Sequence, residues 1–326
     1  MTDWMQLVGG GVLLYFGAEW FVGGASALAL ALRIPQILIG LTVVAYGTSA
    51  PEVVVGIEAA SAGHGDLALA NVIGSNIANV GLILGVAVLI KPARVHQGLR
   101  GRELPVLMGC LAFLPLLLID GKISRWEVAG LLLTALGYTI WMVREARSAS
   151  SLASVEAAVS AAGAAADAAG APEAKKGGSA RGALLASVGL LLLVVGGSLF
   201  VDGSVAVART LGLSDQLVGL TIVAVGTSLP ELATSIVAAL RGHSDLAVGN
   251  VVGSNIFNVL VCLGAAALAG PVGAPLASVG LDLVALTVMT ILLGIVIRAP
   301  RTISRVEGGS LLALYVAFMV AVVTRG

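Results

Sequence analysis

The chain has 326 residues, of which 58% are hydrophobic and only 11% are charged. Soluble domains carry about 25% charged residues, so this composition, with a mean hydropathy of +1.03, excludes a soluble protein and indicates one that crosses a membrane several times. The formal net charge is zero, and neither a nucleic acid nor a nucleotide is expected as a partner.

Apolar segments long enough to span a bilayer recur along the whole sequence. A helix needs about 20 apolar residues to cross the hydrocarbon core. On that measure the sequence predicts an all-α polytopic membrane protein with ten transmembrane helices. These spans lie near residues 5–30, 35–62, 66–90, 102–120, 125–146, 182–209, 214–240, 245–269, 276–298 and 303–324.

One long interruption separates two sets of five spans. Residues 148–181 are rich in Ala, Ser and Gly and lack bulky apolar side chains, which is typical of a linker, with part of it helical. The predicted organisation is therefore a first five-helix unit, 1–147, a linker, 148–181, and a second five-helix unit, 182–326.

The two units repeat each other. The stretch Gly40–Val80 recurs as Gly219–Val259, 179 positions later, with roughly two-thirds of the paired residues identical, and Ile123–Glu127 recurs as Ile303–Glu307. Because five is an odd number, the second unit must enter the membrane with the opposite orientation. Inverted repeats of this kind are typical of secondary transporters, whose binding site lies at the midplane between the repeats.

The basic residues predict which way the chain is oriented. With the N-terminus outside, the inner loops hold 14 of the 18 Lys and Arg residues, and only Lys122, Arg125, Arg209 and Arg325 lie outside. Positively charged loops face the cytoplasm. We therefore expect a protein of the cell (inner) membrane with both termini outside and the linker inside.

An acidic residue lies in the middle of the second span, beside a break in the helix. Pro51 has no N–H, so the carbonyl of Gly47 loses its helical partner, and the hydroxyls of Thr48 and Ser49 and the carboxylate of Glu52 add further oxygens. Such an all-oxygen set suits a hard cation such as Na+ or Ca2+. The second half repeats it as Gly226, Thr227, Ser228, Pro230 and Glu231.

The following helix of each half carries a polar stripe. Residues spaced by four share one helix face, and a polar face in an apolar span is expected to point into the bundle. No Lys or Arg in the adjoining spans neutralises Glu52 or Glu231, whereas two carboxylates would balance one Ca2+ or two Na+. The stripes comprise Asn71, Ser75 and Asn79, and Asn250, Ser254 and Asn258.

The residues alone leave several functions open for this site. Na+/Ca2+ antiport is favoured, an H+/Ca2+ or broader Na+/cation antiporter is the alternative, and a cation channel would use the same oxygens. The sequence has no phosphate-binding loop, zinc-protease motif or Ser/His/Asp set, so no enzyme is expected. His64 and His243 occupy matching turns and are expected to serve there rather than as ligands.

The duplicated motifs resemble the α-repeats of the cation/Ca2+ exchanger superfamily, in particular those of the prokaryotic sodium/calcium exchangers. The resemblance rests on GTSAPE at Gly47–Glu52 and GSNIAN at Gly74–Asn79, and on GTSLPE at Gly226–Glu231 and GSNIFN at Gly253–Asn258. It implies electrogenic Na+/Ca2+ exchange by alternating access, with no cofactor beyond the transported ions. It further implies that the first and sixth helices slide across a rigid core.

The resemblance also assigns ligands. It implies a Ca2+ site formed by Glu52, Glu231, Thr48 and Thr227. The Na+ sites would use Ala45, Ser49, Ser75, Asn79, Ala224, Ser228, Ser254 and Asn258.

Two differences from related sequences indicate which ions are expected to drive transport. The K+-dependent exchangers carry Asp where Asn258 stands, which disfavours K+ transport, and proton-driven relatives carry a different motif from Gly47–Glu52. Glu19 and Glu58 have Ser198 and Val237 as counterparts and are not part of the predicted site.

Overall fold

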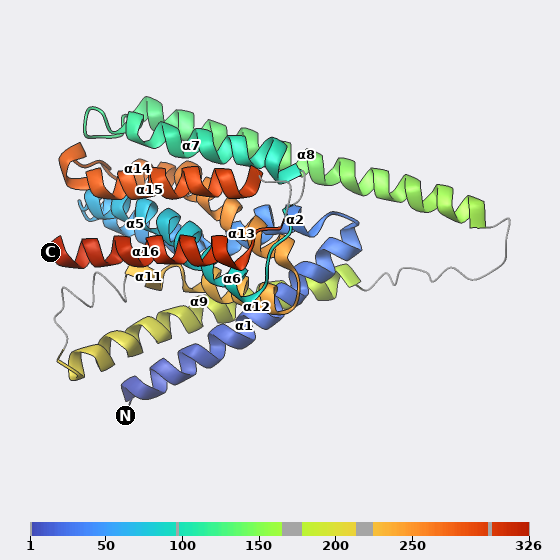
Figure 1. Cartoon of the computed structure of the whole chain (residues 1–326), viewed down its shortest axis with the longest axis horizontal. Coiled ribbons are helices and arrows are strands. Elements are labelled where there is room, and N and C mark those ends of the chain that lie inside the picture. Colours follow the sequence, from blue (N-terminus) through green and yellow to red (C-terminus); the bar gives the residue numbers. More distant parts are fainter. Residues whose placement is uncertain (1, 96–97, 165–177, 213–223, 299–301, 326) are drawn as a thin grey trace.

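The computed structural model describes residues 2–95, 98–164, 178–212, 224–298 and 302–325 and is an elongated helical bundle (Figure 1). Within these ranges the only β pairing is an isolated bridge between Ala93 and Ile303. The first half comprises α1 (Thr2–Leu32), α2 (Gln36–Ile39), η1 (Gly40–Val44), α3 (Ala45–Thr48), α4 (Ala50–Ser61), α5 (Gly65–Ala78), η2 (Asn79–Leu84), α6 (Gly85–Ile90), η3 (Leu99–Glu103), α7 (Leu104–Leu117) and α8 (Arg125–Ala164). The second comprises α9 (Gly178–Thr210), α11 (Ala224–Gly226), α12 (Leu229–Leu240), α13 (Ser244–Phe257), η5 (Asn258–Cys262), α14 (Leu263–Ala269), α15 (Leu276–Arg298) and α16 (Arg305–Arg325).

The helices confirm a multi-pass membrane protein. Seven described helices are long and apolar enough to cross a bilayer, and an eighth span results if the bent pair Gln36–Thr48 and Ala50–Ser61 is counted as one. Of the remaining predicted spans, 102–120 appears as α7 preceded by the π-helical segment η3. The span at 214–240 is described only from Ala224, because residues 213–223 lie outside the described ranges. Ten spans therefore stay a prediction.

The predicted linker begins as a helix. Helix α8 continues past residue 147 to Ala164 and extends well beyond the other helices (Figure 1). The small residues that cannot build a core are good helix formers when alanine dominates, which explains why the helix does not end at the membrane boundary. The next described residue is Gly178, where α9 begins.

Helices α1 and α9 pack against each other along most of their length, at an angle to the rest of the bundle (Figure 1). Glycines spaced by seven residues line the contact on both helices. A β-carbon added to Gly17 would lie 2.8 Å from the backbone nitrogen of Leu193, and one added to Gly189 would lie 2.4 Å from that of Phe21. Small residues let membrane helices approach to backbone contact. The contact glycines are Gly10, Gly17 and Gly24 on α1 and Gly182, Gly189, Gly196 and Gly203 on α9.

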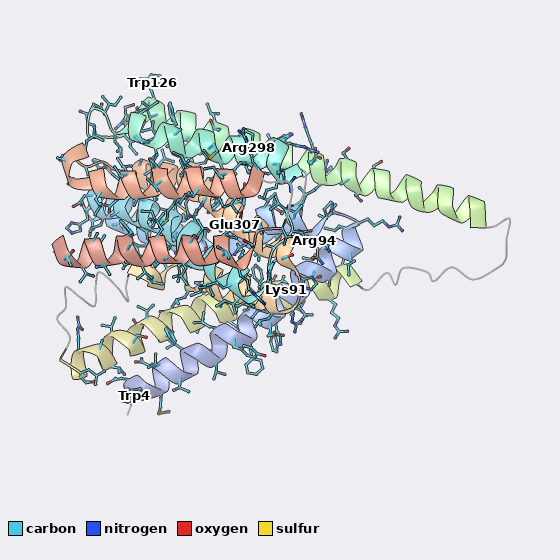
Figure 2. All side chains as sticks on the ribbon, in the orientation of Figure 1. Trp4, Lys91, Arg94, Trp126, Arg298 and Glu307 are labelled. Carbon is cyan, nitrogen blue, oxygen red and sulfur yellow. The ribbon has the colours of Figure 1, made fainter. Side chains whose placement is uncertain are left out.

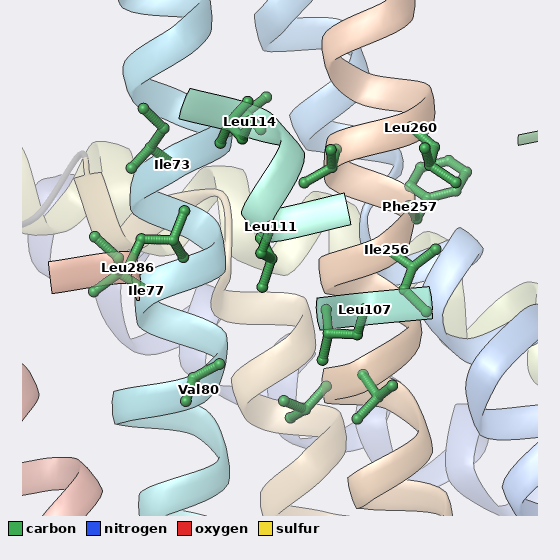
Figure 3. Close-up of a cluster of buried hydrophobic side chains, with 14 of the residues drawn as sticks. Ile73, Ile77, Val80, Leu107, Leu111, Leu114, Ile256, Phe257, Leu260 and Leu286 are labelled. Carbon is green, nitrogen blue, oxygen red and sulfur yellow. The ribbon is translucent and has the colours of Figure 1, made fainter. Parts of the chain in front are cut away.

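The remaining helices enclose a larger apolar core. Figure 3 shows Ile73 and Ile77 of α5, Leu111 of α7 and Ile256 of α13 within one buried cluster. A separate cluster joins α1 and α9 to the C-terminal part of α12 through Val237 and Ala238. The α1–α9 pair therefore has its own packing surface against the core.

The loops that connect the helices repeat each other across the two halves. The amide of Ile303 donates to the carbonyl of Ala93 over 2.8 Å, and the amide of Ile123 donates to the carbonyl of Val272 over 2.9 Å. Ala93 and Val272 are 179 positions apart, and Ile123 and Ile303 are 180 apart. The same backbone contact is thus made twice with the halves exchanged.

Three labelled basic residues lie at the end of the bundle away from the two termini (Figure 2). Both termini lie at one end of the bundle (Figure 1). Trp4 and Trp126 lie toward that same end, whereas Lys91, Arg94 and Arg298 lie toward the opposite end, from which α8 projects (Figure 2). Basic residues gather on the cytoplasmic side of membrane proteins, and the orientation with both termini outside stays a prediction.

The glycine contact predicts that alanine substitutions at two neighbouring positions differ in their effect on stability. In Gly10→Ala the new methyl group would lie 2.4 Å from the backbone nitrogen of Phe200, whereas nothing lies within 4 Å of a β-carbon at Gly9. We expect Gly10→Ala to cost about 1–3 kcal/mol through overpacking and Gly9→Ala to be neutral or slightly stabilising. Thermal unfolding of the detergent-solubilised protein measures both, and equal melting temperatures would contradict the backbone contact.

The turn between α12 and α13 predicts a pH effect on stability. Burial, and then the charges of Arg241 and Lys91, lower the pKa of His243, whose Nδ1 lies 3.1 Å from Gln36 Oε1. The unfolded chain therefore binds the proton more readily, and stability is lost as the pH falls below about 6.5. We expect the melting temperature of His243→Asn to fall less than that of the native protein between pH 7.5 and 5.5. His64→Asn, in the exposed matching turn, is the control and should follow the native profile.

Candidate functional site

Each half contains a helix broken at a serine. In the first half α3 ends at Thr48, Ser49 has φ −86° and ψ 9°, and α4 begins at Ala50 with Pro51 in its first turn. The axis bends by 41° between the two pieces. Proline removes one intrahelical hydrogen bond and crowds the preceding turn, which accounts for the break.

The second half reproduces this geometry. Ser228 has φ −89° and ψ 9° between α11 and α12, and Pro230 lies in the first turn of α12. The two breaks agree within a few degrees although they are separated by 179 residues. As a result Glu52 and Glu231 occupy the first turns of α4 and α12, where free backbone N–H groups favour negative charge.

The two carboxylates are completely buried and are connected across the halves. Glu52 and Glu231 are each 1% exposed. Ser49 Oγ donates to Glu231 Oε1 over 2.8 Å, and Ser228 Oγ donates to Glu52 Oε1 over 3.3 Å. Each serine of a break thus bonds the glutamate of the other half, which brings both predicted motifs into one site.

The remaining carboxylate oxygens have no partner in the described part of the chain. Oε2 of Glu52 and Oε2 of Glu231 are buried and accept no hydrogen bond. Neither carboxylate forms an ion pair with a described Lys, Arg or His, and no described group of three His, Cys, Asp or Glu residues is arranged to hold a metal. A cation bound by these two carboxylates would therefore need hydroxyl, amide and carbonyl oxygens as its further ligands.

The polar stripes line the same interior. Ser75, Asn79, Ser254 and Asn258 are at most 2% exposed, so the predicted inward orientation of these stripes is confirmed. Asn71 is half-buried and donates to the carbonyl of Glu52 over 3.3 Å.

Two asparagines next to the polar stripes also lie in this buried interior, although the sequence analysis did not name them. Asn79 Nδ2 donates to Asn255 Oδ1 over 3.0 Å, and Asn76 Oδ1 and Asn255 Nδ2 are buried without partners. Cys262 Sγ lies 3.3 Å from Asn258 Oδ1 and 3.9 Å from the carbonyl of Ser49. Asn76 and Asn255 are identical in both repeats, and that identity was the available signal. Cys262 has Ile83 as its counterpart, so the repeat gave no signal for it.

The backbone around the stripes is locally π-helical. Asn79 begins η2 and Asn258 begins η5, at equivalent positions of the two halves, and η1 precedes the first break. Such π-helical turns occur frequently at functional sites because they disturb the regular i to i−4 bonding. Sequence patterns of helical period do not reveal them.

The other predicted ligands lie around the breaks. Thr48 Oγ1 lies 3.0 Å from the carbonyl of Val44 and 3.5 Å from that of Ala45. Ala224 begins α11, and Thr227 follows that helix directly. Among described atoms, Ser75 Oγ is buried and has no partner.

A cavity of about 280 Å³ reaches the two breaks from the side of α9. Its walls include Gly226, Thr227, Pro230 and Pro51, and helix α9 contributes Ser198 and Asp202. Two acidic residues to which the sequence assigned no role lie away from this cavity: Glu19 forms an ion pair with Arg241, and Glu58 is exposed on α4. The site is thus rich in buried oxygen atoms, and a cavity borders it on the side of α9.

Comparison with known proteins yields consistent matches over the whole chain. The family model described as "Sodium/calcium exchanger protein" matches residues 2–144 and 181–324. The putative antiporter CaxA of Alkalimonas amylolytica is 37% identical over 94% of both chains. The sodium/calcium exchanger MaX1 of Methanosarcina acetivorans is 33% identical over 98% of both chains.

The fold is matched as well. A solved structure of the sodium-calcium exchanger NCX_Mj, soaked with Na+ and Sr2+, superimposes with a TM-score of 0.82 at 30% identity and covers 98% of each chain. The family resemblance of the two motifs is therefore confirmed over nearly the full length. The buried carboxylates, the paired breaks and these matches together show that the chain belongs to the sodium/calcium exchanger family.

Proposed function

We propose that this protein exchanges Na+ for Ca2+ across the membrane by alternating access, electrogenically and without K+. The observation that carries the proposal is the pair Glu52 and Glu231, buried together, bonded through the serines of opposite halves and without a basic partner. Uncompensated charges at this depth are costly. Bound cations supply the missing positive charge.

Charge balance supports exchange between these two ions. Two carboxylates carry two negative charges, which one Ca2+ or two Na+ neutralise. Because both ions need the same carboxylates, they compete for the site. Exchange of two Na+ for one Ca2+ moves no net charge, so the proposed electrogenic cycle moves more than two Na+ for each Ca2+.

The proposed ligands follow from residues around the two breaks and stripes. Ca2+ is bound by oxygens only, commonly six to eight of them, and the two carboxylates with the neighbouring hydroxyls supply the centre of such a set. We assign Ca2+ to Glu52, Glu231, Thr48 and Thr227. We assign Na+ to Ala45, Ser49, Ser75, Asn79, Ala224, Ser228, Ser254 and Asn258, with no other cofactor.

The packing of α1 and α9 supports alternating access. These two helices contact each other by backbone-to-backbone packing at glycines, and they border the breaks through α12, α3 and α11. A pair held together in this way is suited to move as one unit across the core. The cavity beside Thr227 and Pro230 is the corresponding access route in this conformation.

The inverted repeat explains how one site can open to either side. The matching dihedral angles at Ser49 and Ser228 and the exchanged loop contacts of Ala93 and Val272 support two five-helix units, 1–147 and 182–326, of opposite orientation. We place the protein in the cell (inner) membrane with both termini outside and residues 148–181 in the cytoplasm.

The decisive test is Ca2+ uptake into proteoliposomes loaded with Na+. We expect uptake by the native protein to require internal Na+, to be unaffected by replacing external choline with K+, and to respond to the membrane potential. Glu52→Gln should reduce uptake by at least 100-fold, because one of the two charges that hold Ca2+ is removed. Radiolabelled Ca2+ measures each of these.

The control vesicles distinguish the alternatives. Uptake driven equally well by an acid interior would assign the protein to proton-coupled exchange, which uses the same carboxylates. Uptake that needs no counter-ion would assign it to a channel. Glu58→Gln, which changes an exposed carboxylate of the same helix, should transport like the native protein.

Cation binding is also expected to appear as thermal stability. A ligand at 100 times its Kd stabilises a folded protein by about 2.7 kcal/mol, so Ca2+ should raise the melting temperature of the native protein. Glu52→Gln should lose most of this increase, and without cations it should be more stable than the native protein because a buried like charge is gone. Glu58→Gln should keep the full increase. A Ca2+ effect that persists in Glu52→Gln would contradict the assigned site.

A further inference from the structure

One buried amide contacts proposed ligands of both halves. Asn250 is 0% exposed on α13. Thr48 Oγ1 of the first half lies 3.2 Å from Asn250 Oδ1, and Ser254 Oγ of the second half lies 3.5 Å from the same oxygen. The other end of the amide, Nδ2, donates to Ser235 Oγ over 3.1 Å.

We propose that Asn250 is a positioning residue of the cation site, which accepts the hydroxyl protons of Thr48 and Ser254 and so directs the lone pairs of both oxygens toward the transported ion. The inference rests on the proposed function, because it concerns the orientation of ligands assigned there. Asn250 itself is not a proposed ligand.

The chemistry of a hydroxyl ligand requires such an acceptor. A hydroxyl has one proton and two acceptor lone pairs, and only a lone pair binds a cation. Its proton must therefore point to an acceptor away from the ion. For Thr48 the acceptors within reach are the carbonyls of Val44 and Ala45, the amide oxygen of Asn250 and the carboxylate of Glu231.

A bound ion disfavours some of these acceptors for the Thr48 proton. The Ala45 carbonyl and the Glu231 carboxylate are themselves proposed ligands, so a proton directed at either would compete with the ion. The Val44 carbonyl, the nearest acceptor at 3.0 Å, lies in the preceding turn of the same helix. Asn250 is the acceptor that links Thr48 to Ser254, because both hydroxyls lie within 3.5 Å of its Oδ1.

The orientation of the amide is fixed by a residue that only one half possesses. With Oδ1 facing two hydroxyls, Nδ2 needs an acceptor, and Ser235 provides it from a position that is 0% exposed. The counterpart of Ser235 is Gly56, which has no side chain. The counterpart of Asn250 is Asn71, which is half-buried and donates to the Glu52 carbonyl instead. The two halves are therefore unequal at this point.

This inequality provides a matched control. We expect Asn250→Leu to raise the KM for Ca2+ and for Na+ by at least tenfold, with less than a twofold change in Vmax, because ligand orientation is lost while the carboxylates remain. Asn71→Leu, the same change at the equivalent position, removes only the hydrogen bond to the Glu52 carbonyl and should raise either KM by a smaller factor than Asn250→Leu. Ser235→Ala should raise both in the same direction as Asn250→Leu, by a smaller factor.

A double mutant separates positioning from general damage. If Asn250 acts by orienting the Thr48 hydroxyl, Thr48→Val already removes that effect, and adding Asn250→Leu should raise the KM for Ca2+ by less than threefold more. Multiplicative effects of the two changes, or equal KM increases in Asn250→Leu and Asn71→Leu, would overturn the proposal. Should Asn250→Leu fail to give a monodisperse protein, Asn250→Ser, whose hydroxyl is too short to reach Thr48, replaces it in the same comparison.

Native protein and Glu52→Gln measured in parallel keep this test distinct from that of the function. If the native protein shows no Na+-dependent uptake, the proposed function fails. Native protein, Asn250→Leu and Asn71→Leu are then compared by the Ca2+ concentration that gives half-maximal thermal stabilisation. If the native protein exchanges and Glu52→Gln does not, an unchanged KM in Asn250→Leu rejects the positioning role alone.

Discussion

The structure depends on one electrostatic constraint: two carboxylates are buried side by side in a membrane protein without a basic residue to pair with them. Glu52 and Glu231 each have one oxygen bonded by a serine of the opposite half and one oxygen without a partner among the described residues. Replacing them by apolar residues would remove the cost of burying charge. In the function proposed above, mobile cations supply the opposite charge during part of the transport cycle.

The backbone around these carboxylates is shaped to leave oxygens available. Prolines in the first turns of α4 and α12 and the matching angles at Ser49 and Ser228 interrupt the helices of both halves at equivalent positions. The π-helical segments that begin at Asn79 and Asn258 disturb the next helices as well. Irregular backbone at membrane depth is tolerated where it lines a polar cavity. The geometry is therefore a property of the duplicated motif and not of either half alone.

Much of this arrangement was predictable from the sequence, because the two halves of the chain repeat each other and can be compared. The repeat identified the breaks, the carboxylates and the stripes, and hydropathy placed the spans. The contacts between halves were not predictable: nothing local pairs Ser49 with Glu231, Asn79 with Asn255 or Asn250 with Thr48. The seven-residue spacing of glycines is visible in α1 and in α9, but its partner is revealed only by the fold. The extent of α8 was underestimated because alanine-rich sequence resembles a linker and a helix equally.

The contact between α1 and α9 has a consequence for assembly. The first helix of one half is bound to the first helix of the other by direct backbone packing, and the loop contacts of Ala93 and Ile123 also join opposite halves. The covalent connection between α8 and α9 then acts as a tether that raises effective concentration, while the interface itself determines how the halves recognise each other. Two separately synthesised halves would keep all of these contacts as a means of associating in the bilayer.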